Sequence, residues 1–142
     1  MSMLPVSGTS RSHRIALDLP YVLFTLAYLV MIFWLSTHTE AMTSGRGPLA
    51  QLASTLYHVP LYAGFGFFIL QAISRRQALA AYPWSRVTFT FAAAAVVAML
   101  DEWRQFHIPG RDPAAFDVLL DLAGVAGLLL VCALGSTQKQ RS

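Results

Sequence analysis

Charged residues are what this sequence has least of. Only 12% of its 142 residues are charged, whereas 56% are hydrophobic. Soluble domains carry roughly 25% charged residues, so this chain has too few polar side chains to cover a globular surface in water. Its surface must be solvated largely by lipid, and the sequence therefore predicts a membrane protein with the bilayer as its first partner.

Cysteine is nearly absent as well. The single Cys132 lies in an apolar run, which excludes an intramolecular disulfide and a cysteine-based metal site. The net charge of +3 comes from basic residues that form no run or stripe, so we expect no nucleic-acid partner. The spacing HExxH is missing too. No cofactor is predicted, and a divalent metal held by histidine and carboxylates is left as an alternative.

Four apolar segments, separated by polar or breaker-rich stretches, predict four transmembrane helices. A helix of 18 residues, such as the first, rises ~1.5 Å per residue and nearly crosses a ~30 Å hydrocarbon core. The third can continue to about Phe106, where the Ile-Pro-Gly at 108–110 stops it. The predicted helices are Leu19 to Ser36, Ser54 to Ile73, Pro83 to Leu100 and Pro113 to Leu134.

The predicted fold is all-α, a polytopic membrane protein built as a bundle of four transmembrane helices. One domain, residues 19–134, is flanked by polar tails at 1–18 and 135–142. A cleaved signal peptide is the alternative for the first apolar segment, because basic residues precede it. The length of that segment, and the lack of a small-x-small cleavage site after it, favour a membrane helix.

Basic residues are unevenly divided between the two predicted faces of the membrane. Seven of the ten fall on the face that carries the two tails and the loop between the second and third helices. The positive-inside rule therefore predicts that both termini are cytoplasmic. Six of the seven acidic residues fall on the opposite, extracytoplasmic face. The seven basic residues are Arg11, Arg14, Arg75, Arg76, Arg86, Lys139 and Arg141.

Charge is concentrated between Asp101 and Asp121, which contain five of the seven acidic residues and two of the ten basic ones. Threading four helices brings this stretch to the same end of the bundle as His58 and Tyr62. Asp101 lies 15 residues beyond Arg86, ~22 Å at helical rise, and so can lie within the membrane. A charge facing lipid there costs ~2.5 kcal/mol or more, so these groups should face one another or water.

Helical spacing selects a candidate cluster from three helices. Asp101 and Gln105, like Asp117 and Asp121, are four residues apart and share a helix face. An ion network that only holds the helices together is the structural alternative to a ligand site. The predicted cluster is His58, Tyr62, Asp101, Glu102, Gln105, Arg111, Asp117 and Asp121. Expected solvated loop residues are Arg104, His107 and Asp112, and expected interface residues are Ser36, His38 and Glu40.

The same residues resemble a known family. The run DEWRQFHIPGR at 101–111, followed by Asp117, is similar to the signature of the VanZ-like family of bacterial membrane proteins. The histidine-then-tyrosine pair His58 and Tyr62 also matches, and the resemblance covers residues 20–134. It implies a multi-pass protein of the bacterial cytoplasmic membrane, in a family named for teicoplanin resistance. It implies no biochemical mechanism.

Ser36 matches a serine often found at the end of the first helix in that family, but other positions depart from the pattern. Asp121 stands where the family usually has asparagine, and Asp112 where serine or threonine follows the arginine. Tyr57 replaces a lysine or polar residue before the histidine. The site is therefore more acidic than the family pattern, which argues against a simple pocket for an anion.

Several functions are compatible with this sequence. The first is a small envelope protein whose extracytoplasmic site influences how lipid-linked cell-wall precursors or lipoglycopeptides meet the membrane. The second is an enzyme on a lipid-linked substrate, with His58 as general base and carboxylates as acid or metal ligands. The third is proton- or ion-coupled transport through intramembrane carboxylates. A structural role in a larger membrane complex is the fourth, and the sequence leaves catalysis and oligomeric state open.

Overall fold

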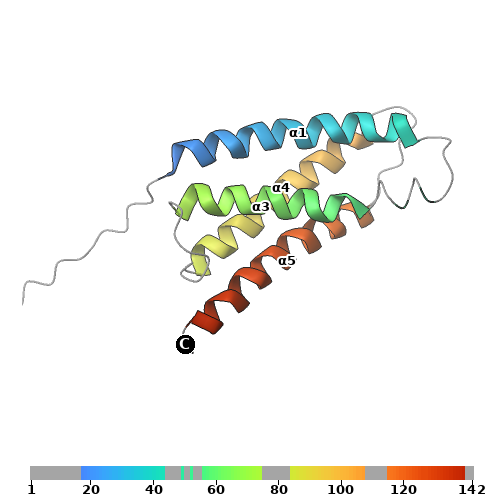
Figure 1. The fold of residues 1–142 in the computed structure, drawn as a ribbon. Coiled ribbons are helices and arrows are strands. Elements are labelled where there is room, and N and C mark those ends of the chain that lie inside the picture. Colours follow the sequence, from blue (N-terminus) through green and yellow to red (C-terminus); the bar gives the residue numbers. More distant parts are fainter. Residues whose placement is uncertain are drawn as a thin grey trace, which may run out of the picture.

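The structure, a computed structural model, describes residues 17–43, 49, 52, 56–74, 84–107 and 115–139. Within these ranges the chain is all-helical, as predicted. Figure 1 shows α3 between α1 and α5, with α4 crossing behind it. The helices are α1 (Leu19–Thr43), α3 (His58–Ser74), α4 (Trp84–Phe106) and α5 (Ala115–Lys139).

Three of the helices are long and apolar enough to cross a membrane. Their candidate spans are Leu19–His38, Trp84–Phe106 and Ala115–Gly135, with mean hydropathies of 1.9, 1.2 and 2.4. The fourth helix, α3, is apolar but has only 17 residues. It packs against all three others and is the most buried helix, so its neighbours cover it. This arrangement supports a four-helix, multi-pass membrane protein.

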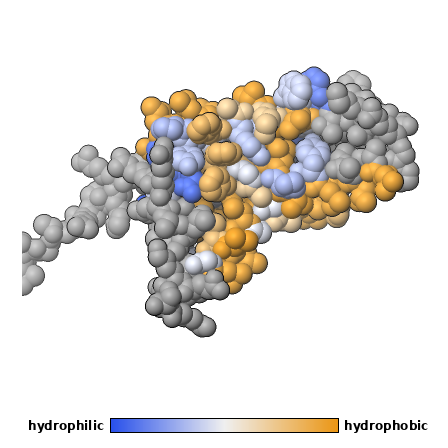
Figure 2. Space-filling model, viewed as in Figure 1, coloured by the Kyte–Doolittle hydropathy of each residue, from blue (hydrophilic) through white to orange (hydrophobic). Residues whose placement is uncertain are grey.

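The outer faces of the long helices are hydrophobic. Leu23 on α1, Val96 on α4 and Leu119 on α5 are each more than half exposed, and hydrophobic residues cover much of the described surface in Figure 2. Contiguous apolar surface of this extent is unusual on soluble monomers. Lipid is the solvent that suits these faces.

The helix bounds differ from the predicted ones. α1 runs beyond Ser36 to Thr43. Thr37 and His38 lie in this extension, and their side chains bond carbonyl oxygens one turn back, at 2.7 and 2.8 Å. α3 begins at His58, which places Pro60 in the first turn, where proline removes no helical hydrogen bond. The C-terminal helix continues to Lys139, inside the segment predicted as a polar tail.

One close approach fixes α5 against the start of α3. A Cβ added at Gly124 would overlap the carbonyl oxygen of Val59, so only glycine lets the two backbones come this near. Asp121 lies one turn before Gly124, and His58 directly precedes Val59. The glycine contact therefore sets the distance between the aspartate and the histidine.

Candidate functional site

The predicted cluster gathers where α1 and α4 finish and α3 and α5 begin. We call this the site end of the bundle, defined by Ser36, His58, Asp101, Gln105, Asp117 and Asp121. All except Asp117 are buried, although each is polar or charged. Three different helices contribute the predicted members, as the threading of the sequence required, and α1 adds Ser36.

His58, the first residue of α3, lies between two carboxylates from successive turns of α5. Its Nδ1 is 2.8 Å from Oδ1 of Asp121, a buried hydrogen bond. Its Nε2 is 4.0 Å from Oδ2 of Asp117, whose side chain is 14% exposed. That second distance is too long for a hydrogen bond. The imidazole is therefore anchored by Nδ1, and Nε2 is left facing the Asp117 side of the site.

Tyr62 lies one helical turn after His58 and is fully buried. Its hydroxyl makes no hydrogen bond to any described residue. The carboxylates of Asp121 and Asp101 act electrostatically on this hydroxyl. Buried polar side-chain atoms usually have a partner. Tyr62 is therefore a buried polar residue whose hydroxyl has no hydrogen-bond partner among the described residues.

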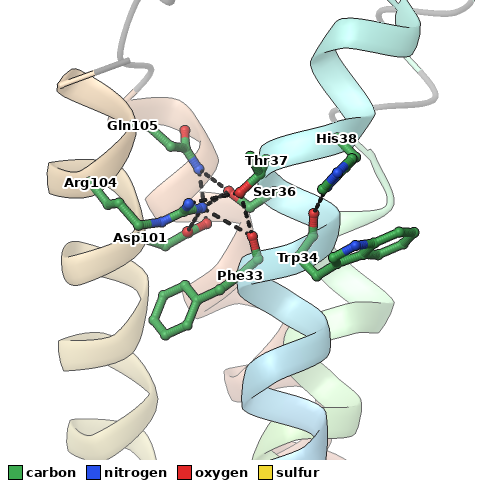
Figure 3. A network of polar contacts seen from close by, with 8 residues as sticks. All are labelled: Phe33, Trp34, Ser36, Thr37, His38, Asp101, Arg104 and Gln105. Carbon is green, nitrogen blue, oxygen red and sulfur yellow. Dashed lines mark hydrogen bonds and ion pairs between the residues drawn. The ribbon is translucent and has the colours of Figure 1, made fainter.

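A second group of contacts joins α4 to α1 (Figure 3). Both carboxylate oxygens of Asp101 accept hydrogen bonds: Oδ1 from Arg104 Nη2 at 3.0 Å, and Oδ2 from Gln105 Nε2 at 2.8 Å. The same Gln105 nitrogen donates to Ser36 Oγ at 2.7 Å. We call these four residues, with Thr37 and the carbonyl of Phe33, the α1–α4 network.

Arg104 corrects the sequence prediction. It was expected in a solvated loop, but it lies in the last turn of α4 and reaches across to α1. Its Nη2 donates to the carbonyl oxygen of Phe33 at 3.1 Å and to Ser36 Oγ at 3.2 Å, and its Nη1 donates to Thr37 Oγ1 at 2.7 Å. The guanidinium also lies 5.4 Å from the centre of the Phe33 ring.

Ser36 corrects it too. The residue was expected at the membrane interface, but it is 3% exposed and accepts from both Gln105 and Arg104. The spacing of Asp101, Arg104 and Gln105, which share one helix face, was the signal for this network. His38 and His107 are exposed, and each bonds a carbonyl oxygen of its own helix, which fits the predicted interface and solvated positions.

Glu102 occupies a different position from the rest of the cluster. It lines an open groove of about 490 Å³ between α4 and α5. The other lining residues are apolar: Met99, Trp103, Phe106, Ala115 and Val118. Glu102 is therefore the charged residue of an otherwise apolar groove. Arg111 and Asp112 lie outside the described residues, as does the side chain of Glu40.

Two of the chemical alternatives can be compared with this geometry. Within the described ranges, no group of three or more His, Cys, Asp or Glu is placed to hold a metal ion. Buried polar residues occur at the site end and again at the opposite end, where Gln71, Ser74 and Thr90 lie. The described core cluster that includes Phe65, Ile69 and Ala94 is hydrophobic. The described residues thus provide no continuous chain of polar groups for ion transport.

The arrangement can bind a polar group and can move a proton at His58 Nε2. A fold of packed helices does not itself imply an activity, so the function depends on the side chains at the site end. No family model, no curated protein and no solved structure matches this chain.

Proposed function

We propose that this chain is a VanZ-like, multi-pass protein of the bacterial cytoplasmic membrane that binds the polar head group of a lipid-linked envelope molecule. The carrying observation is the buried His58–Asp121 pair beside the unpartnered hydroxyl of Tyr62, within apolar helices. Burying polar groups without partners costs roughly 1–3 kcal/mol each. Groups retained at such a cost are expected to serve a ligand.

The neighbouring groove supports a ligand that arrives from the bilayer. Its walls include Trp103 and Phe106, which are exposed toward the surroundings of the bundle. Asp117, the more accessible of the two carboxylates that flank His58, is in α5, the helix that supplies the groove residues Ala115 and Val118. A lipid chain in the groove would have its head group at the site end of the bundle.

The proposed orientation places the site end on the extracytoplasmic side, with both termini in the cytoplasm. The distribution of arginine and lysine supports it. A phosphatase reporter fused after Ser142 is then expected to be inactive, and a fluorescent cytoplasmic reporter at the same position active. The reverse pattern would overturn the orientation, and with it the outer-leaflet ligand.

The envelope setting rests on the VanZ-like resemblance, whose motif residues His58, Tyr62, Asp101, Gln105 and Asp117 are members of this site. Cells that produce the protein are expected to differ from null cells in teicoplanin susceptibility, and Asp117→Ala to behave as the null. Equal susceptibility of null and producing cells, with the protein detected in the membrane, would count against an envelope role.

Direct binding is the decisive test. The full chain, purified gently from membranes, is expected to retain a lipid class that mass spectrometry identifies, and Tyr62→Phe to retain less of it. Tyr28→Phe is the matched control, because Tyr28 also packs in the bundle, with its ring stacked on Phe65. Purified protein that carries no lipid, or equal retention in all three forms, contradicts the proposal.

A second function, catalysis on a lipid-linked substrate, is favoured by the way His58 is held. A carboxylate on Nδ1 orients an imidazole and stabilises its charged form, so that Nε2 can act as a general base. Asp121 supplies that carboxylate at 2.8 Å. Incubation of the purified chain with membrane lipids should then generate a product that His58→Ala does not. Unchanged lipids in that assay, and in a deletion strain, would exclude this function.

A further inference from the structure

We infer that the ligand of this site presents a primary ammonium group, carried by a membrane lipid whose chain lies in the groove between α4 and α5. This inference rests on the proposed binding of a lipid head group, and it adds the chemical class. Three observations carry it: the charge of the site, its surplus of acceptors and the apolar groove next to it.

The described site end is negatively charged. Three carboxylates, those of Asp101, Asp117 and Asp121, stand against the one guanidinium of Arg104, which leaves −2 with His58 neutral. The complete stretch 101–121 has five acids and two arginines, so it carries −3. A phosphate or carboxylate ligand would meet repulsion here, whereas a cation gains from it.

Asp101 is already neutralised, so the cation belongs on the other side of the site. Both oxygens of Asp101 accept hydrogen bonds from Arg104 and Gln105. Asp117 and Asp121 have only His58 as an ion-pair partner within the described chain, at 4.0 and 2.8 Å. One imidazole between two carboxylates leaves negative charge uncompensated.

Hydrogen-bond capacity points the same way. Two carboxylates and the Tyr62 oxygen offer many lone pairs, but the donors among them are the imidazole N–H and one hydroxyl. An –NH₃⁺ group brings three donors and no acceptor, and its bonds to carboxylates are charge-assisted. The unpartnered Tyr62 hydroxyl, 0% exposed, can accept one of them. A quaternary ammonium has the charge but no donor, so it fits less well.

The groove determines where the rest of the ligand lies. Met99, Trp103 and Phe106 form its apolar wall, and each is at least half exposed. Glu102 adds a carboxylate to that wall, which suits a cationic head group and disfavours an anionic one. An alkyl chain against this wall, with its ammonium toward Asp117, satisfies both the apolar and the acidic surfaces.

The test uses the full chain in mild detergent, incubated with equal amounts of dioleoyl-phosphatidylethanolamine, -phosphatidylcholine and -phosphatidylglycerol. Native mass spectrometry counts the retained lipids. We expect the ethanolamine lipid to be retained about tenfold over the choline lipid, since tenfold corresponds to ~1.4 kcal/mol, near the lower end for a hydrogen bond to a charged group. The glycerol lipid should be retained least.

Variants locate the preference. Asp117→Asn and Tyr62→Phe are expected to reduce the tenfold preference severalfold, and Glu102→Gln to reduce it less. Asp18→Asn, which removes a carboxylate at the start of α1, far from the site end, should leave it unchanged. Circular dichroism checks that each variant keeps its helices, so that a loss of lipid preference cannot be caused by unfolding.

The outcomes separate the inference from the function on which it rests. Equal retention of ethanolamine and choline lipids, or a preference for the glycerol lipid, overturns the ammonium ligand but leaves head-group binding intact. Retention of no lipid overturns both. Release of the bound ethanolamine lipid by ethylammonium chloride, but not by sodium chloride at equal concentration, supports the ammonium class. Release by sodium alone overturns it in favour of a metal cation.

Discussion

The α1–α4 network and the His58 site use similar side chains at the same end of the bundle. They differ in how many of their donors and acceptors have hydrogen-bond partners. In the network, both oxygens of Asp101 accept hydrogen bonds, and Ser36 accepts from two donors. In the His58 site, the Tyr62 hydroxyl has no hydrogen-bond partner within the described chain, and His58 Nε2 lies 4.0 Å from Asp117.

The difference follows from what each region has to hold together. α1 packs chiefly on α3 and touches α4 only slightly, so the polar contacts of Arg104 and Gln105 supply much of the link between these two helices. α3 and α5 already pack extensively, along the line that includes Gly124. The polar groups of α3 and α5 are therefore not needed to hold the two helices together, which leaves these groups available for a ligand.

The largest expected effect is on the network. Asp101→Ala removes the acceptor of both Arg104 and Gln105 and leaves a largely buried charge and amide without it. Breaking one partner of a buried ion pair costs ~3–5 kcal/mol, and the partial exposure of Arg104 places this case near the lower limit. Thermal unfolding in detergent, followed by circular dichroism, should show a clearly lower midpoint.

Asp101→Asn is the control for that prediction, because it keeps the shape and one carbonyl acceptor. It should fall between wild type and Asp101→Ala. An Asp101→Ala protein as stable as wild type would show that the network does not hold α1 to α4.

The next largest effect is expected at the backbone contact between Gly124 and Val59, which sets the distance between His58 and Asp121. Gly124→Ala places a methyl group against the Val59 carbonyl, which must move. Overpacking of this kind costs ~1–3 kcal/mol. It should also weaken lipid retention, because Asp121 moves with α5 away from His58.

Gly127→Ala is the matched control for that substitution. A Cβ at Gly127 meets nothing within 4 Å, and the residue lies on the exposed side of the same helix. Equal stability of the two alanine variants would mean that the close approach at Gly124 is not important for packing.

Ser36→Ala tests whether the network depends on its α1 end. The substitution removes an acceptor from Gln105 and Arg104, but each keeps Asp101. A net hydrogen bond contributes ~1 kcal/mol, so the unfolding midpoint should fall by less than in Asp101→Ala. Lipid retention should be unaffected, because the hydrogen bond between His58 and Asp121 does not involve Ser36. A loss of lipid binding equal to that of Asp117→Asn would show that the α1–α4 network and the His58 site act as one binding site.

The sequence was sufficient for the coarse arrangement. Apolar length predicted the helices, and threading them predicted that His58, Asp101 and Asp121 would gather at one end. It was not sufficient for the partners. The His58–Asp121 bond joins residues 63 positions apart, and its formation depends on how α3 and α5 are rotated about their axes.

That rotation is set by close contacts such as Gly124 against Val59 and not by hydropathy, because lipid accepts any apolar face. The same reasoning explains the error at Arg104. Its bonds to Phe33 and Thr37 join residues 71 and 67 positions apart, and they depend on how α1 and α4 are rotated about their axes. Apolar length does not predict that rotation.

The smallest expected effect on stability is also the sharpest test of the comparison. Tyr62→Phe removes a hydroxyl that makes no hydrogen bond, from a ring that is fully buried. Since no bond is lost and a polar atom leaves the interior, the unfolding midpoint should stay the same or rise slightly. Head-group retention should nevertheless fall. A marked loss of stability would show that the hydroxyl is held within the fold, and Tyr62 would then belong with the network residues rather than with a ligand site.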